Sequence, residues 1–198
     1  MGIYPESKVV PGKLQTHEFL IRPLRASDVE ADYDALMESR EMLRIWDQSE
    51  WPADDFTLED NRADLQDHEE DHAARQSFTF TVMDPADRTC LGCIYLHELK
   101  SVLQAHGVGT DALQKVGAMD VYVTFWVRAS RLKDGLDQKL LTRLTKWFDE
   151  SWAFDRVAWG ANTADTHQQQ LFFNAGLIEK WRLPIGDSQE CYLLFERA

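Results

Sequence analysis

The strongest structural pattern in the sequence lies at residues 120–152, DVYVTFWVRASRLKDGLDQKLLTRLTKWFDESW. Its first part, residues 120–128, is rich in β-branched and aromatic residues, which predicts a buried strand. Its last part, residues 135–152, repeats apolar side chains every three or four positions and predicts an amphipathic helix. The apolar face of that helix consists of Leu136, Leu140, Leu144, Trp147 and Phe148.

Apolar periodicity predicts further elements on both sides of this stretch. We expect strands at residues 19–25, 77–83, 89–99, 156–161, 177–183 and 190–196, and helices at 27–44, 58–75 and 166–174. Ser27 is the expected N-cap of the first helix, and Thr57 with Asp60 forms a capping box before the second. Residues 100–117 contain three glycines and are expected to form a long surface loop.

The order of these elements is β-α-α-β-β-β-α-β-α-β-β, which mixes antiparallel hairpins with a strand–helix–strand crossover. This order predicts an α/β domain of the α+β type, with one mixed sheet and helices on its faces. Residues 1–17 are expected to form a loose N-terminal arm, and residues 18–198 the single domain.

The chain has 198 residues and a formal net charge of −13. Such a surface repels phosphate backbones and anionic lipid, so we expect neither a nucleic-acid nor a membrane partner. No run approaches the roughly 20 apolar residues that span a bilayer, and residues 1–13 lack the apolar core of a signal peptide. We therefore expect a cytoplasmic protein. Three cysteines are too few for a disulfide scaffold.

Two short motifs match metal or redox patterns. Residues 68–72 (HEEDH) fit the H-E-x-x-H pattern of zinc proteases, but the many neighbouring acids favour a solvated helix face, and no clear third ligand follows. Cys90 and Cys93 lie in a predicted strand, where residues three apart point to opposite faces, so packed core thiols are favoured. We expect no metal site. A hydrolase triad is excluded because no G-x-S-x-G elbow is present.

The loop at residues 128–135 (RASRLKDG) carries three cations of an otherwise acidic chain. It joins a strand end to a helix start, where free N–H groups and the helix dipole attract an anion. Ligands of α/β sheets often bind just beyond the carboxyl ends of strands, and Gly135 allows close backbone approach. The alternative is a solvated loop whose cations pair with nearby acids, and the residues alone leave both open.

At this segment the sequence resembles the GCN5-related N-acetyltransferases (GNAT). Their signature R/Q-x-x-G-x-G/A lies between a central strand and a helix, and residues 132–137 (LKDGLD) take that place. Residues 91–96 (LGCIYL) are similar to a glycine-containing strand of the branch that includes ribosomal-protein N-terminal acetyltransferases. Residues 156–177 align without gaps to a strand–helix segment of that branch. A looser resemblance covers about residues 19–197.

The resemblance implies acetyl-CoA as the acyl-donor cosubstrate. Backbone groups of the central strand would hold the thioester and the pantetheine, and they belong to Phe125, Trp126 and Val127. The residues implied for the pyrophosphate are Arg131, Lys133, Asp134, Gly135, Leu136 and Asp137. Asp165 stands where that branch often has Asn and is included in the expected cofactor site. Dimers are common in this fold, so a homodimer is a further expectation.

In the family, the acceptor amine attacks the thioester directly, with a base that removes its proton. Asp120, at the start of the central strand, is the candidate base, and His97 and Glu98 are the alternatives. A carboxylate base that works near neutral pH needs a pKa raised by burial. An acceptor pocket and ordinary core packing are both open for Trp46, Trp51 and Tyr95.

Two functions follow as hypotheses. The first is an acyl-CoA-dependent N-acyltransferase that acts on an amine of a small molecule or a protein terminus. The second is a non-catalytic GNAT-fold module that binds an acyl-CoA or a partner without turnover. The second is motivated by residues that depart from the family pattern, which are Leu132, Asp137, Asp165 and Phe172.

Overall fold

The computed structural model describes residues 2–116, 120–185 and 190–197. One mixed sheet has the strand order β1-β2-β3-β4-β5-β6-β8-β7, in which β5 and β6 are parallel and the other neighbours antiparallel. The strands are β1 (Leu14–Gln15), β2 (Leu20–Pro23), β3 (Phe78–Met83), β4 (Cys90–His97), β5 (Val121–Val127), β6 (Val157–Asn162), β7 (Leu177–Pro184) and β8 (Cys191–Arg197).

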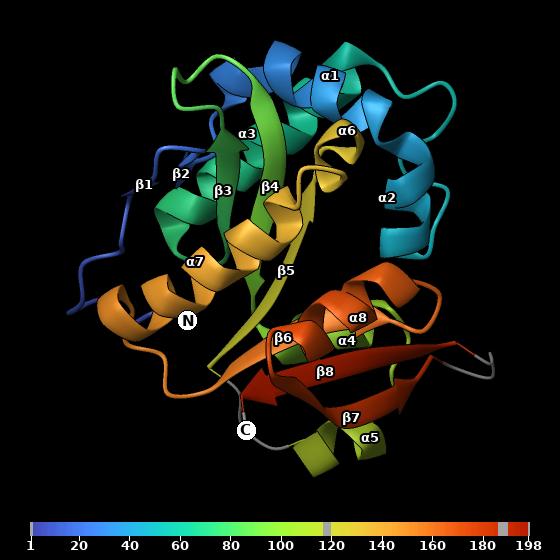
Figure 1. The fold of residues 1–198 in the computed structure, drawn as a ribbon. Helices are drawn as coiled ribbons and strands as arrows, with labels where there is room; N and C mark the ends of the chain where they lie inside the picture. Colours follow the sequence, from blue (N-terminus) through green and yellow to red (C-terminus); the bar gives the residue numbers. More distant parts are fainter. Residues whose placement is uncertain (1, 117–119, 186–189, 198) are drawn as a thin grey trace.

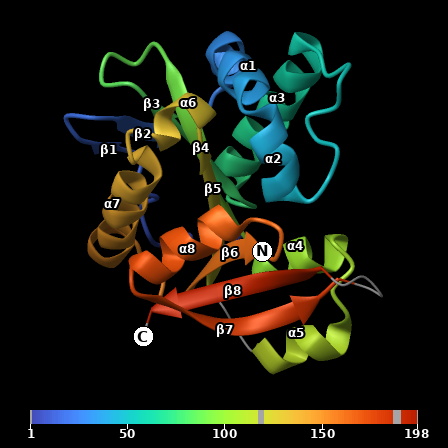
Figure 2. The same ribbon diagram turned by 45° about the vertical axis from the view of Figure 1, so that its right-hand side comes forward.

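Helices cover both faces of this sheet (Figures 1 and 2). The helices are α1 (Val29–Glu38), α2 (Arg40–Asp47), α3 (Leu58–Ala74), α4 (Leu99–Ala105), α5 (Thr110–Val116), α6 (Ala129–Leu132), α7 (Leu136–Ser151) and α8 (Thr166–Asn174), with a 3-10 turn at Ala26–Asp28. Buried side chains of α7 and α8 share one core cluster, and those of α1 and α3 share another. Among the described residues, no helix has the length and apolar character needed to cross a membrane.

The predicted fold class is confirmed, and residues 120–152 contain the strand and the helix that their pattern predicts. β5 is buried along nearly its whole length, and α7 turns all five predicted apolar side chains into the core. Phe125 on β5 packs edge-to-face on Trp159 and lies near Phe172 of α8. Burial of such aromatic side chains contributes about 1.5–3 kcal/mol each, so this cluster stabilises the junction of strand and helices.

The sheet divides between β5 and β6. These strands pair only where residues 121–123 face residues 157–159. Beyond that point β5 continues along β4 as far as the pair of Val127 with Gly92, whereas β6 continues along β8. Figure 1 shows the two strands diverging from a common origin, β5 toward α6 and β6 toward α8. A wedge therefore opens between their carboxyl ends.

Three local predictions are corrected. Residues 100–117 were expected as a loop, and residue 117 lies outside the described residues. The others contain most of α4 and all of α5, because Leu103, Leu113 and Val116 supply buried contacts that outweigh the neighbouring glycines. The helix expected at 27–44 is interrupted at Ser39, whose hydroxyl donates to the Ala35 carbonyl at 2.7 Å. The expected N-cap at Ser27 is also wrong, since the first turn follows Arg25.

Of two further local predictions, the structure agrees with the first and differs from the second. The capping box at Thr57 is confirmed, because its hydroxyl accepts the Asp60 N–H at 3.1 Å and the Asp60 carboxylate accepts the Thr57 N–H at 2.9 Å. The N-terminal arm is anchored rather than loose. Tyr4 is 4% exposed, its ring lies 5.1 Å from that of Trp152, and its hydroxyl accepts the Ala153 N–H.

The expected orientation of the two strand cysteines is wrong. Val82 pairs with Gly92 but Met83 pairs with Cys90, so Leu91 is an extra residue and β4 contains a β-bulge. The bulge breaks the simple alternation of the strand. As a result, Cys90 and Cys93 both face the cluster that contains α1, and Leu91 faces the opposite cluster.

Candidate active site

A cavity of about 440 Å³ lies beside the wedge. Seven helices and strands contribute to its wall, from both halves of the divided sheet. The lining residues are Trp46, Asp47, Trp51, Asp64, His68, Tyr95, His97, Val102, Ala105, His106, Tyr122, Thr124, Gly160, Ala161, Asn162, Asp165 and Tyr192. This volume falls within the range of small-molecule sites.

One wall of the cavity depends on Gly160. A Cβ atom at this position would lie 2.1 Å from the hydroxyl oxygen of Tyr122, so only glycine lets the phenol cross from β5 against β6. Burial raises the pKa of Tyr122, and the hydroxyl therefore remains neutral at physiological pH. Neither residue was predicted, because a Tyr in an apolar strand and a lone Gly carry no specific signal.

Aromatic rings form a second wall. The Tyr95 ring lies 5.9 Å from that of Trp46, 5.6 Å from that of His68, and stacks on His97 at 6.2 Å. The indole Nε1 of Trp126 donates to the Tyr95 hydroxyl at 3.2 Å, which fixes the ring. The structure thus brings Trp46, Trp51 and Tyr95 to one cavity, as the acceptor-pocket interpretation requires.

The charged groups of the lining are acidic. Asp47, Asp64 and Asp165 all reach the cavity, and none of the described residues that line it is a Lys or an Arg. Burial raises the pKa of Asp64 and of Asp165. An acidic, aromatic-lined cavity of this kind attracts a cation through both its carboxylates and its ring faces.

His97 reaches the cavity from β4, next to the start of β5. Burial, together with a smaller effect of the neighbouring His68, lowers the pKa of His97 to about 4. Burial also lowers the pKa of His68. Both imidazoles are therefore neutral at pH 7. Protonation of either one would leave a charged imidazolium buried away from water, which is unfavourable.

This depressed pKa predicts a loss of stability in acid. An unfolded His binds a proton near pH 6.5, whereas folded His97 binds one only near pH 4. The unfolded state therefore holds more protons within this window, and stability should fall as pH decreases from about 6.5 to 4. Urea unfolding at pH 7 and pH 5 measures the loss. It should be smaller in His97→Gln; an equal loss in the variant would contradict the assignment.

A second, narrow pocket of about 70 Å³ lies at the carboxyl end of β5. It is lined by Met42, Trp46, Phe125, Trp126, Val127, Leu132, Asp137, Asp165, His167 and Gln168. Five of the ten predicted cofactor residues meet here, since Phe125, Trp126, Val127, Asp137 and Asp165 all line it. Trp46 and Asp165 also line the large cavity, so the two spaces share a wall at the mouth of the wedge.

The basic loop is less cationic than its sequence suggests. Arg128 pairs with Asp34 at 2.7 Å and with Glu38, and this contact lowers the pKa of Glu38 to about 2. Arg131 pairs with Asp134 at 2.9 Å. Both arginines are therefore paired with carboxylates, as expected from the alternative interpretation of this segment as a solvated loop. Lys133 is exposed and forms no ion pair with any described residue.

The start of α7 still offers backbone donors. Gly135 has φ 65° and is the N-cap of this 16-residue helix, a left-handed conformation that glycine adopts without strain. The next three N–H groups have no acceptor within the helix. Leu136 is 2% exposed and packs in the core, so its side chain is not available to a ligand.

Asp137 does not face the loop. Its carboxylate lies 2.6 Å from Nε2 of His167 on α8, and the residue is 5% exposed. This contact links the start of α7 to the start of α8 across the wedge. The negative charge that the sequence places beside the loop is therefore directed at a histidine.

The structure does not bring the predicted base Asp120 to either pocket. Asp120 is exposed, and its carboxylate accepts the backbone N–H groups of Asp155 and Arg156. It precedes β5, whereas the wedge opens after residue 123, at the other end of the strand. Glu98, an alternative, is exposed and accepts the Ser101 hydroxyl. Of the proposed bases, only His97 lines the cavity.

Asn162 is a site residue that the sequence did not reveal. It is 1% exposed, and its amide donates to the carbonyls of Ile45 and Trp46 at 2.9 and 2.8 Å. Its oxygen accepts the N–H groups of Ala164 and Asp165. One side chain therefore positions both residues that the two pockets share.

The histidines of the HEEDH motif are not on a solvated face. His68 Nδ1 lies 3.2 Å from the Thr79 hydroxyl, and His72 Nδ1 lies 3.2 Å from the Thr79 carbonyl. Both rings thus hydrogen-bond to β3 rather than converge on a common point. Among the described residues, the one group with ligand atoms close enough for a metal is Asp32, Cys90 and Cys93.

The sequence matches no protein-family model and no curated protein sequence. Solved structures do match. The ribosomal-protein-S5-alanine acetyltransferase from Vibrio fischeri superposes with a TM-score of 0.68 at 14% identity, over 94% of this chain and 96% of that chain.

Two further structures contain a cofactor. The microcin C7 self-immunity acetyltransferase MccE, in complex with acetyl-CoA and AMP, has a TM-score of 0.70 at 10% identity, covering 98% of this chain and 99% of that one. The ribosomal L7/L12 alpha-N-protein acetyltransferase RimL, in complex with coenzyme A, has a TM-score of 0.67 at 13% identity, covering 91% and 94%. The chain therefore has the GNAT fold, which the sequence resemblance implied.

Proposed function

We propose that this chain is an acyl-CoA-dependent N-acyltransferase that binds acetyl-CoA in the wedge and acetylates a cationic primary amine held in the large cavity. One observation carries the proposal. The unpaired edge of β5 borders a narrow pocket, and that pocket shares Trp46 and Asp165 with an acidic, aromatic-lined cavity. A donor and an acceptor would thus meet at one place.

The donor is assigned to the wedge because of its backbone. Beyond Val123, β5 pairs with no described strand on its β6 side. The peptide groups of residues 124–127 that point away from β4 are therefore available to the amides of a pantetheine arm. The first turn of α7 supplies N–H groups and a positive dipole end for the pyrophosphate, and exposed Lys133 adds a cation. The complexes of MccE and RimL with acetyl-CoA and coenzyme A support this choice of donor.

The acceptor is assigned from the charge and shape of the cavity. Its carboxylates and ring faces favour an ammonium group, and its 440 Å³ suit a small molecule or the end of a peptide. The net charge of −13 favours the approach of a cation for the same reason.

The reaction needs a base where the two spaces meet. The acceptor ammonium loses one proton, its nitrogen attacks the thioester carbonyl carbon, and the carbon–sulfur bond breaks as the amide forms. A second proton leaves the nitrogen, and the departing thiolate takes up a proton. Asp165 lines both pockets, and burial raises the pKa of its carboxyl. We assign it as the group that receives a proton from the amine.

The test of this function is release of free coenzyme A thiol from acetyl-CoA across a panel of amines. Steady, amine-dependent release with cationic amines is expected, together with an acetylated product of the matching mass. Absence of release with every amine, while acetyl-CoA still binds, would instead favour the non-catalytic module.

Substitution of Gly135 tests the pyrophosphate position. Gly135→Asp should bind acetyl-CoA about tenfold more weakly than Gly135→Asn, because a carboxylate at the N-cap of α7 would repel the pyrophosphate. Asn is the matched control, since it has nearly the same shape and tolerates the left-handed backbone. Calorimetric titration measures both affinities, and equal dissociation constants would place the pyrophosphate elsewhere.

A further inference from the structure

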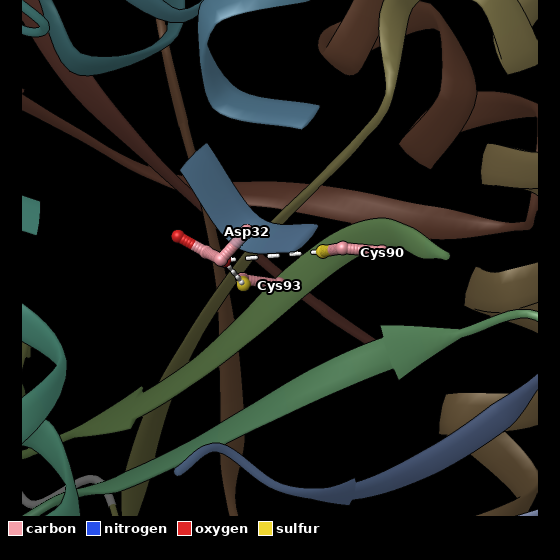
Figure 3. Close-up of side chains that lie close together, drawn as sticks. All are labelled: Asp32, Cys90 and Cys93. Carbon is pink, nitrogen blue, oxygen red and sulfur yellow. Dashed lines mark hydrogen bonds between the residues drawn. The ribbon is translucent and has the colours of Figure 1, made fainter. Parts of the chain in front are cut away.

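Three buried side chains with metal-binding atoms meet between α1 and β4, outside the proposed active site (Figure 3). Asp32 Oδ1 lies 3.3 Å from the Cys93 sulfur and 3.8 Å from the Cys90 sulfur. All three ligand atoms lie within 4.8 Å of one another. The bulge in β4 creates this arrangement, because it turns both sulfurs toward α1.

Asp32 has an unusual environment for a carboxylate. It is 3% exposed, lies in an apolar cluster, and forms no ion pair with any described residue. Its conventional donor is the Asn61 amide at 3.1 Å, and its other contacts are the two thiols. Buried carboxylates normally pair with a cation or coordinate a metal.

The distances match a tetrahedral zinc centre. Zinc bonds are about 2.3 Å to a thiolate and about 2.0 Å to a carboxylate oxygen, so the oxygen–sulfur edge of the tetrahedron is about 3.5 Å. The two observed Asp32–sulfur distances lie on either side of this value. A water would take the fourth position of the tetrahedron.

We propose that Asp32, Cys90 and Cys93 form a structural zinc site that joins α1 to β4. Two thiolates and a carboxylate carry three negative charges, so the zinc-bound site has a net charge of −1, and the Asn61 N–H faces the carboxylate. Binding releases the two thiol protons and, where Asp32 is protonated, a third. Cys93 pairs with Trp126 of β5, so the metal would stiffen the strand edge that lines the narrow pocket.

Zinc binding at this site should depend on pH. Cys90 and Cys93 bind a metal only as thiolates, so protons compete with zinc for their sulfurs. Zinc affinity should increase steeply from pH 6 to pH 8, because each ligand must be deprotonated before it can bind.

Cobalt substitution tests the proposal directly. The full-length protein is refolded with one equivalent of Co²⁺ under reducing conditions, and its absorption spectrum is recorded. The expected result is a thiolate-to-cobalt charge-transfer band in the near ultraviolet, with one bound metal per chain. Cys191→Ser is the matched control, because Cys191 lies on β8 outside the cluster, and it should keep the full band.

Two variants and one stability measurement complete the test. Cys93→Ser should lose most of the band, and Asp32→Asn should bind Zn²⁺ at least tenfold more weakly while keeping the size of the side chain. Zn²⁺ should raise the melting temperature of the wild type and of Cys191→Ser, but not of Cys93→Ser. The proposal is overturned if the wild type shows no charge-transfer band, or if Cys191→Ser loses it.

Discussion

Asp165→Asn is expected to lower kcat for acetyl transfer by about 100-fold while leaving the dissociation constant of acetyl-CoA within about twofold. A positioned general base typically contributes 10²–10⁴ in rate, and the amide of Asn accepts no proton at neutral pH. Among the described residues, Asp165 is the one acidic residue shared by the narrow pocket and the acceptor cavity. Removing its charge should therefore affect the proton transfer and not the cofactor.

The substitution is mild for the structure. Asp165 is the N-cap of α8, where its carboxylate accepts the Gln168 N–H at 2.9 Å, and Asn caps a helix about as well as Asp. Steady-state thiol release and calorimetry separate the two effects. A kcat close to the wild-type value would show that another group takes the proton. A parallel loss of acetyl-CoA affinity would show that Asp165 binds the donor instead.

Gly92→Ala is expected to destabilise the fold by about 3–5 kcal/mol, at the upper end of single substitutions. A Cβ atom at this position would lie 2.1 Å from the Trp126 carbonyl oxygen and 2.9 Å from the Val127 Cα. These are backbone atoms of β5, which cannot rotate away. Gly92 also has φ 150°, a value that side-chain-bearing residues rarely adopt. The clash falls where β4 holds the unpaired end of β5.

Gly12→Ala is the matched control for this substitution. No atom lies within 4 Å of a Cβ at Gly12, and the residue is exposed, so its effect should stay within about 0.5 kcal/mol. Urea unfolding of both variants gives the comparison. A loss below 1 kcal/mol in Gly92→Ala would mean that β4 and β5 separate more easily than their register indicates.

The sequence predicted the elements that have strong periodicity and missed those defined by tertiary contacts. The strand at 120–128 and the helix at 135–152 were predicted nearly to their bounds, because both patterns are long and regular. The helix α5 was missed because its burial depends on contacts with β7. The break at Ser39 was missed because it depends on a side chain that hydrogen-bonds to a carbonyl of its own helix.

The candidate site was predictable in its donor half and less so in its acceptor half. The signature position of Gly135 identified the loop, and the strand pattern identified residues 125–127. The pairing of Arg128 with Asp34 and Glu38 was not visible, because these acids are about 90 positions away along the chain. Asn162 was missed for the same reason, because it contacts Trp46 from a strand that is distant in the sequence.

The prediction of Asp120 as the base also failed because it depends on how distant strands pair. The position of Asp120 in the sequence placed it at the start of the central strand. That position does not show where the two halves of the sheet separate. That point is set by the register of β5 with β6, which ends at residue 123 and moves the chemistry to the far end of the strand.

The most direct test of the central claim is calorimetric titration of the wild-type chain with acetyl-CoA. We expect saturable binding of one acetyl-CoA per chain, because the wedge offers an unpaired strand edge, a helix start and a pocket in line. No detectable binding at millimolar acetyl-CoA would contradict it, and with it the assignment of this GNAT fold as an acyl-CoA-dependent enzyme.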